Sequence, residues 1–87
     1  MYKDIVLSFV HASWCGQCKA LEPVVKEVVL ETGVDYKDVD AEKEMELCEK
    51  KGIMNLPVIF ISKGDKELRI DGIVSKEKIV DTIKSLC

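Results

Sequence analysis

Two cysteines separated by two residues are the side chains of this sequence whose type and spacing best suit chemistry. They are Cys15 and Cys18, in the stretch Trp-Cys-Gly-Gln-Cys-Lys that begins at Trp14. The surrounding pattern predicts a strand before them and a helix after them, which puts Cys15 at a helix N-terminus. There, free backbone N–H groups and the positive end of the helix dipole favour a thiolate, lowering a cysteine pKa from about 8.5 toward neutrality. Cys15 is therefore the predicted nucleophile.

The second cysteine is placed to resolve the bond that the first one forms. Cys18 follows three positions later, almost one helical turn, so both sulfurs face the same side of the helix. A mixed disulfide on Cys15 lies within reach of Cys18, which can release the product and close an internal disulfide. A Cys-X-X-Cys pair can also be half of a zinc site. We favour thiol–disulfide exchange because the pair stands where a strand turns into a helix.

Hydrophobic patterning predicts the elements on either side of the cysteines. Residues 5–10 are apolar apart from Ser8, as expected of a central strand that is buried on both faces. After Cys15, apolar residues at i, i+3, i+4, i+7 and i+8 form one stripe of a helix, namely Leu21, Val24, Val25, Val28 and Val29. Gly33 is expected to end this helix, and Pro23 to kink it.

A second strand and a second helix are predicted next. The strand covers residues 34–39, and Asp40 is the expected N-cap of the helix that follows. Glu42 and Glu44 would then stand in the first helical turn, where the helix dipole favours negative charge. Gly52 is expected to end this helix.

The last part of the chain reads as a hairpin and a final helix. The two strands cover residues 58–61, opened by Pro57, and 67–70, and the final helix begins at Ser75. Strands separated by helices imply parallel crossovers, and the hairpin adds antiparallel strands. The sequence therefore predicts one α/β domain over residues 1–87, with a four-stranded mixed sheet and helices on both faces.

Composition excludes several classes of function. The chain has 87 residues, is 47% hydrophobic and carries a formal net charge of −3 with a pI near 5.1, a balance that does not suggest a nucleic-acid partner. No segment approaches the roughly 20 apolar residues of a membrane span, and the N-terminal apolar run is too short for a signal peptide. We therefore expect a cytoplasmic monomer, in which four cysteines indicate redox or metal chemistry rather than structural disulfides.

Several motifs together resemble the thioredoxin family. The first is Ala-X-Trp-Cys-Gly-X-Cys-Lys from Ala12 to Lys19, followed by Pro23, which is similar to that family's active-site helix. The second is Gly-Ile-X-X-Leu-Pro from Gly52 to Pro57, and the third is Gly72 before the last helix. These landmarks cover nearly the whole chain.

The resemblance implies a thioredoxin fold with strand order 2-1-3-4 and a protein disulfide oxidoreductase that works through a Cys15–Cys18 disulfide without a further cofactor. It implies that Pro57 is cis and that the backbone of Leu56 pairs with an extended substrate segment. Trp14, Gly16 and Gln17 would contact the substrate beside the disulfide. The implied partners are protein disulfide substrates and an NADPH-linked disulfide reductase, with no nucleic acid and no membrane.

The sequence departs from the family pattern in three ways. It resembles the minimal core that thioredoxins share with glutaredoxins, without an additional strand and helix at the N-terminus. Gln17 replaces a typical proline, which removes a fixed φ angle from the motif. The aspartate that many thioredoxins bury behind the second cysteine has no counterpart near Ser8, Phe9 or Val10, so His11 is the candidate proton-transfer group for Cys18.

Other interpretations remain open from the sequence. A glutaredoxin-like enzyme acting on glutathione mixed disulfides fits the short chain, although the motif between the cysteines favours the thioredoxin side. A zinc-binding module would use Cys15, Cys18, Cys48 and either His11 or Cys87 as ligands. A carrier dedicated to one partner enzyme would share the same residues. Outside the motif, Cys48 is expected to be a core thiol, and Cys87 at the chain end either packs or is exposed.

Overall fold

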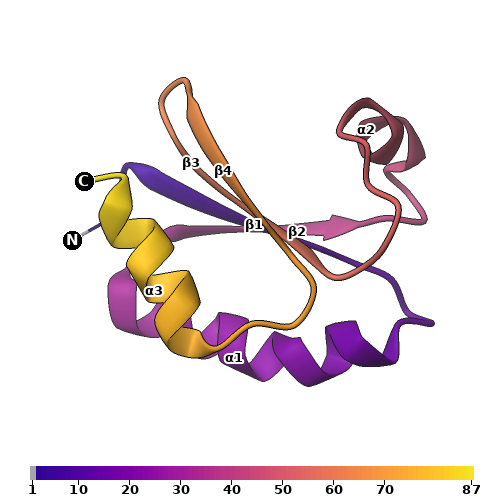
Figure 1. Ribbon diagram of the computed structural model, residues 1–87, viewed down its shortest axis with the longest axis horizontal. Coiled ribbons are helices and arrows are strands. Elements are labelled where there is room, and N and C mark those ends of the chain that lie inside the picture. The colour runs from indigo at the N-terminus through magenta and orange to yellow at the C-terminus, as the bar shows by residue number, and fades with distance from the viewer. Residues whose placement is uncertain (1) are drawn as a thin grey trace.

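A four-stranded sheet in the order β2-β1-β3-β4 forms the centre of the computed structural model, which describes residues 2–87 (Figure 1). Its strands are β1 (Ile5–His11), β2 (Asp35–Asp40), β3 (Val58–Lys63) and β4 (Lys66–Asp71). The central strand β1 pairs in parallel with β2 and antiparallel with β3, and β3 and β4 form an antiparallel hairpin. The predicted mixed sheet and its strand order are confirmed.

Three helices complete the fold: α1 (Gly16–Thr32), α2 (Met45–Lys50) and α3 (Lys76–Ser85). The helices α1 and α3 lie together on one face of the sheet, whereas the short α2 lies at one end of the other face (Figure 1). Helices thus lie on both faces, as predicted. Among residues 2–87, no helix has the length and apolar character needed to cross a membrane.

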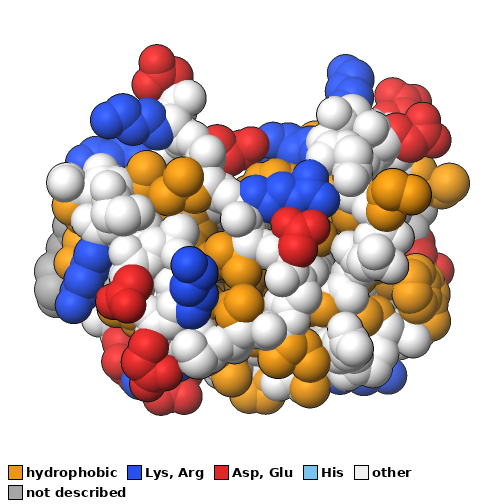
Figure 2. All heavy atoms as spheres, viewed as in Figure 1, with side chains coloured by type: hydrophobic (Ala, Val, Ile, Leu, Met, Phe, Trp, Pro, Cys, Tyr) orange, Lys and Arg blue, Asp and Glu red, His pale blue; other side chains and the backbone are white. Residues whose placement is uncertain are grey.

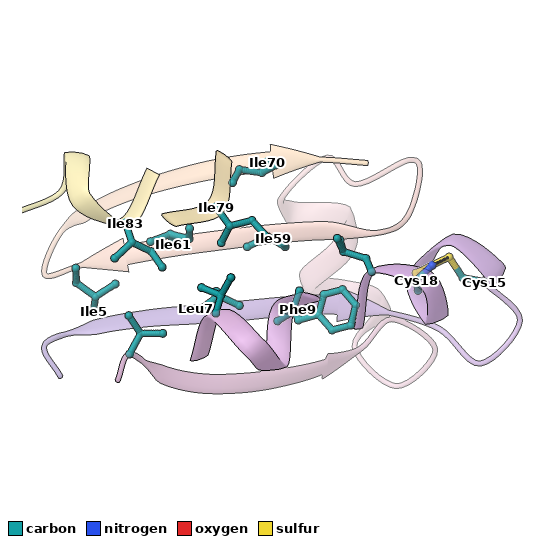
Figure 3. Packing of buried hydrophobic residues seen from close by; sticks show 14 of the residues in the cluster. Ile5, Leu7, Phe9, Cys15, Cys18, Ile59, Ile61, Ile70, Ile79 and Ile83 are labelled. Carbon is teal, nitrogen blue, oxygen red and sulfur yellow. Dashed lines mark hydrogen bonds between the residues drawn. A yellow bond between two sulfur atoms is a disulfide. The ribbon is translucent and has the colours of Figure 1, made fainter. Parts of the chain in front are cut away.

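The main core lies between the sheet and the pair α1 and α3. Alternate residues of β1 point into it, Ile5, Leu7 and Phe9, because successive side chains of a strand face opposite sides of the sheet. Figure 3 shows them facing Ile59 and Ile61 of β3 and the isoleucines of α3. Both cysteines of the motif belong to the same cluster, at its end beyond Phe9. The disulfide is therefore attached directly to the core.

A smaller cluster covers the opposite face only in part. It consists of Val10, Val39, Val58 and Phe60, with Leu47 and Cys48 of α2 packed against it. Of the described residues of α2, 45–50, none is buried. The second face of the sheet is thus covered at one end, by a helix that contributes little to the core.

The long helix α1 begins and ends as the sequence predicts. Gly33 closes it in a left-handed conformation, with φ of 78°, and its N–H donates to the carbonyl of Val29 at 3.0 Å. Pro23 stands inside this continuous helix, where it leaves the carbonyl of Lys19 without its usual N–H donor. Ser75 caps α3 as predicted, its hydroxyl accepting from the N–H of Lys78 at 3.2 Å.

The predicted start of the second helix was wrong. Asp40 is the last residue of β2, and its carboxylate accepts from the N–H of Glu42 at 2.9 Å, which closes a turn rather than a helix. Glu44 is the N-cap of α2, so Glu42 and Glu44 lie outside the first helical turn. The side chain of Asp40 binds the backbone two residues on, and this local turn takes the place of the expected cap.

Two leucines on α1 test where the stabilising core lies. Leu21 is 1% exposed and Leu30 is 85% exposed. We expect Leu21→Ala to lower the free energy of unfolding by about 2–5 kcal/mol through lost burial and a residual cavity. The matched change Leu30→Ala should alter it by less than about 0.5 kcal/mol. Urea unfolding followed by circular dichroism measures both, and equal effects would contradict the described packing.

Candidate active site

A disulfide between Cys15 and Cys18 stands at the N-terminal end of α1, directly after the central strand. The Cα atoms of the two cysteines are 5.3 Å apart, within the range that disulfide geometry allows. Cys15 and Cys18 are 6% and 2% exposed, so the pair forms one end of the core and meets solvent at its edge (Figure 3). The structure brings together the two predicted catalytic residues.

Cys15 is the N-cap of α1. Its backbone is extended, with φ of −91° and ψ of 105°, and its sulfur accepts a hydrogen bond from the N–H of Cys18 at 3.1 Å. This is the position at which a side chain satisfies one of the free N–H groups of the first helical turn. The sulfur of Cys15 therefore already occupies the place where the helix best stabilises a negative charge.

Hydrogen bonds fix the turn that connects β1 to Cys15. The N–H of Cys15 donates to the carbonyl of Ala12 at 3.1 Å, which closes the turn between β1 and α1. The hydroxyl of Ser13 donates to the carboxylate of Glu42 at 2.9 Å, and the Ser13 N–H points to the same oxygen at 3.4 Å. These contacts join the turn before the disulfide to the turn after β2.

The other predicted site residues differ in how far their side chains are exposed to solvent. Trp14 is 70% exposed, and Gly16 and Gln17 are exposed in the first turn of α1. The peptide bond between Leu56 and Pro57 is cis, as the resemblance implied, with Leu56 half-buried and Pro57 buried. Leu56 and Trp14 line the same groove, which links the segment before Pro57 to the cysteine motif.

An apolar groove of about 250 Å³ runs between the cysteine motif and α2. Its lining is almost entirely hydrophobic and includes one carboxylate, and the residues are Trp14, Ala41, Met45, Cys48, Glu49, Ile53, Met54 and Leu56. Two of the methionines are strongly exposed, Met45 at 64% and Met54 at 89%. Figure 2 shows hydrophobic side chains at the surface on the side of the molecule where α2 and the start of α1 lie. This surface can take up an apolar side chain next to the disulfide.

His11 is turned toward β2. Its Nε2 pairs with the carboxylate of Asp38, and its ring stacks on Phe9 with centroids 5.0 Å apart. The hydroxyl of Tyr36 donates to the same carboxylate at 3.2 Å, and burial together with the Asp38 charge raises the pKa of Tyr36. Within residues 2–87, no hydrogen bond joins His11 to either cysteine of the motif. Phe9 lies between this polar group and the core that holds Cys18.

The two remaining cysteines lie apart from the disulfide. Cys48 on α2 is half-buried in the groove wall and packs against the smaller core cluster, so it contacts the core expected of it without being fully buried. Cys87 is exposed at the chain end. Among residues 2–87, no three His, Cys, Asp or Glu side chains are arranged to hold a metal ion. The ligands considered for zinc do not come together.

Sequence reasoning missed the groove and the contacts that hold its walls. Met45, Ile53 and Met54 carry no motif, and Ser13 pairs with Glu42 across 29 positions without a pattern that predicts it. Arg69 binds the backbone at the end of α2. The one signal in the sequence for these contacts was that Arg69 is the only arginine among its 13 Lys and Arg residues.

Comparisons with known proteins agree on one family. The family model described as Thioredoxin matches residues 1–85. Thioredoxin-1 of Caenorhabditis elegans is 36% identical over 77 residues, which make up 86% of this chain and 66% of that protein. Protein disulfide isomerase-like 2-2 of Oryza sativa subsp. japonica is 39% identical over 69 residues, 74% of this chain but 18% of that protein. The chain thus spans slightly less than two thirds of this thioredoxin and less than a fifth of this isomerase.

Solved structures agree with the sequence comparisons. The reduced thioredoxin of Schistosoma mansoni superposes with a TM-score of 0.86 at 28% identity, covering 99% of this chain and 82% of that one. The match therefore includes the cysteine motif, the segment before Pro57 and all three helices. This chain belongs to the thioredoxin family.

Proposed function

We propose that the protein is a thiol–disulfide oxidoreductase that reduces protein disulfides through the dithiol and disulfide forms of Cys15 and Cys18. The observation that carries the proposal is the N-cap position of Cys15, whose sulfur accepts the Cys18 N–H at 3.1 Å. A thiolate at that place is stabilised by the free N–H groups of the first turn of α1 and by the helix dipole. Family membership supports the same chemistry.

The reaction proceeds by two exchanges. In the reduced protein, the Cys15 thiolate attacks one sulfur of the substrate disulfide, forms a mixed disulfide and displaces the other sulfur as a thiolate that takes up a proton. Cys18 then loses its proton and attacks the Cys15 sulfur, which releases the second substrate thiol and closes the internal disulfide. Two electrons pass to the substrate, and an NADPH-linked disulfide reductase must return two electrons to the protein.

Substrate docking is assigned to the surface around the disulfide. An extended substrate segment would pair with the backbone of Leu56, next to Pro57, and place an apolar side chain in the groove beside Trp14. Gly16 and Gln17 are exposed at the first turn of α1 and would face the substrate near the scissile disulfide. These roles rest on the exposure and the shared groove described above.

The proton that leaves Cys18 needs an acceptor. His11 stays the candidate, because it is the one histidine in the sequence and stands at the end of β1, close in sequence to the motif. Its imidazole pairs with Asp38 and stacks on Phe9, and among residues 2–87 no hydrogen bond joins it to Cys18. Water at the solvent-facing edge of the disulfide is the alternative acceptor.

A reducing compartment suits this chemistry. We place the protein in the cytoplasm as a monomer, since two of its four cysteines, Cys48 and Cys87, are free in the described chain and one of them is exposed. In that setting a reductase keeps Cys15 and Cys18 in the dithiol form. Secretion with Cys87 in an intermolecular disulfide would contradict this placement.

Coupled turnover tests the function. NADPH oxidation is followed with insulin as the disulfide substrate and either thioredoxin reductase or glutathione with its reductase as the electron source. We expect turnover with thioredoxin reductase that falls to the uncatalysed rate in Cys15→Ser and persists in the matched variant Cys87→Ser. Turnover with glutathione alone would instead place the protein with the glutaredoxins. No turnover in either arm would refute the proposal, and zinc analysis of the reduced protein would then test the metal-binding interpretation.

The order of thiol reactivity tests the role of the helix N-terminus. After full reduction at neutral pH, a limiting amount of iodoacetamide should modify Cys15 first, although Cys87 is the more exposed thiol. Cys87 serves as the internal control because it lies at the opposite end of the chain and has no helix N-terminus beside it. Peptide mass mapping over time measures both rates. Modification of Cys87 ahead of Cys15 would show that the helix does not activate the thiol.

A further inference from the structure

The helix α2 and the segment that follows it form one wall of the groove, and they contact the core only through side chains that are partly buried or exposed, such as Leu47, Ile53 and Leu56. Of the described residues 45–50, none is buried, and only Leu47 and Cys48 pack against the smaller cluster. Residues 53–56 nevertheless present Ile53 and Leu56 to the groove. Polar contacts with β4 add to this partial packing.

Arg69 of β4 supplies that interaction. Its Nη1 donates to the carbonyl of Lys51 at 2.5 Å, and its Nη2 donates to the carbonyl of Gly52 at 3.4 Å. Lys51 is the C-cap of α2, where helix carbonyls lack intrahelical donors and the negative end of the dipole attracts a cation. Gly52, with φ of 63°, turns the chain out of the helix toward Pro57.

The guanidinium is itself held from the other side. Asp71 accepts from Nε at 2.7 Å and from Nη2 at 3.0 Å, a two-point contact that fixes the plane of the guanidinium group. The hydrogen bonds to Asp71 also raise the pKa of Arg69. Because arginine offers five N–H donors in a rigid fork, it can bind a carboxylate and two carbonyls together, which a lysine ammonium cannot reproduce.

A second contact runs parallel to the first. The ammonium of Lys51 donates to the two carboxylate oxygens of Glu67 at 2.7 and 2.9 Å. Lys51 also lies over the ring of Phe60, 4.5 Å from its centroid, and Arg69 lies 5.7 Å from the same centroid. Alternate residues of β4 thus hold the end of α2 above the hairpin.

The same strand holds the far end of the segment. The N–H of Gly72, directly after β4, donates to the carbonyl of Pro57 at 2.8 Å. Residues 52–57 are therefore attached to one end of β4 at both their beginning and their end. These two attachments, together with the packing of Leu56 against both core clusters, set the position of Leu56 relative to the disulfide.

We propose that Arg69 is a positioning residue for substrate binding, which fixes the Ile53 and Leu56 wall of the groove from β4 without contacting the disulfide. The proposal rests on the function proposed above, because it assigns Arg69 a role in docking a protein substrate. Loss of the guanidinium frees the Lys51 and Gly52 carbonyls and lets the wall move. Docking of an extended substrate then weakens, while the chemistry of the cysteines stays as it is.

The test compares Arg69→Gln, Arg69→Lys and the matched control Lys66→Gln, which removes an exposed cation from the same strand. For Arg69→Gln, we expect KM for insulin to rise about 10-fold with kcat nearly unchanged. The rate of the reduced protein with a small disulfide, 5,5′-dithiobis(2-nitrobenzoate), should stay at the wild-type value because this reagent need not fill the groove. Arg69→Lys should be intermediate, and Lys66→Gln should match the wild type.

Hydrogen exchange provides a measurement that does not depend on activity. The N–H of Ile53 donates to the carbonyl of Cys48 at 2.9 Å, and its exchange should accelerate about 10-fold in Arg69→Gln, with no change at Val25 inside α1. If the wild type failed to reduce insulin, the proposed function would fail, and unchanged Ile53 exchange would separately overturn the positioning role. Equal losses with insulin and the small disulfide, or an unchanged KM, would also overturn it. Should Arg69→Gln not fold, the same comparison is made with Arg69→Lys.

Discussion

The hydrogen bond from the Cys18 N–H to the Cys15 sulfur joins the fold to its chemistry. A helix leaves its first N–H groups without partners, and here a cysteine side chain takes the place of the usual N-cap oxygen. The interaction requires that α1 begin directly after β1, so that the central strand and the long helix together aim both sulfurs at one edge of the core. The strand order and the crossover place α1 against the sheet. Packing along the length of α1 then keeps its first turn, with Cys15, in a fixed position.

The two faces of the sheet differ in how completely they are covered. The face covered by α1 and α3 holds the larger cluster, including the cysteines, and gives the disulfide a rigid base. The other face has a small cluster and a short helix without buried residues, and polar contacts from β4 hold that helix. Because few of its side chains are buried, the position of this wall depends on polar contacts, as the role proposed for Arg69 requires. The exposed methionines of the groove are compatible with the proposed docking of apolar side chains, since methionine side chains adapt to varied apolar surfaces.

Much of the fold could be predicted because its signals are local. The apolar run of β1, the stripe of α1, the left-handed Gly33 and the cap at Ser75 each depend on neighbours in the sequence. The predicted start of α2 was wrong because an aspartate such as Asp40 can either cap a helix or close a turn, and the sequence alone does not distinguish the two. The groove and the contacts that hold its walls could not be predicted. Ser13 binds Glu42, 29 positions away, and Arg69 binds Lys51, 18 positions away, and such isolated long-range contacts leave no periodic pattern in the sequence. The N-cap position of Cys15 could be predicted because the spacing of the motif and its place between a strand and a helix agreed, and its role as the nucleophile stays a prediction.

The identity of the attacking sulfur is the most direct test of this account. In Cys18→Ser, the mixed disulfide with a protein substrate cannot be resolved, so it should accumulate and can be mapped by peptide mass spectrometry after incubation with insulin. We predict a stable adduct that is linked through Cys15 and is released by added dithiol. An adduct linked through Cys48 or Cys87, or no adduct at all, would contradict the claim that the N-cap thiol of α1 is the nucleophile.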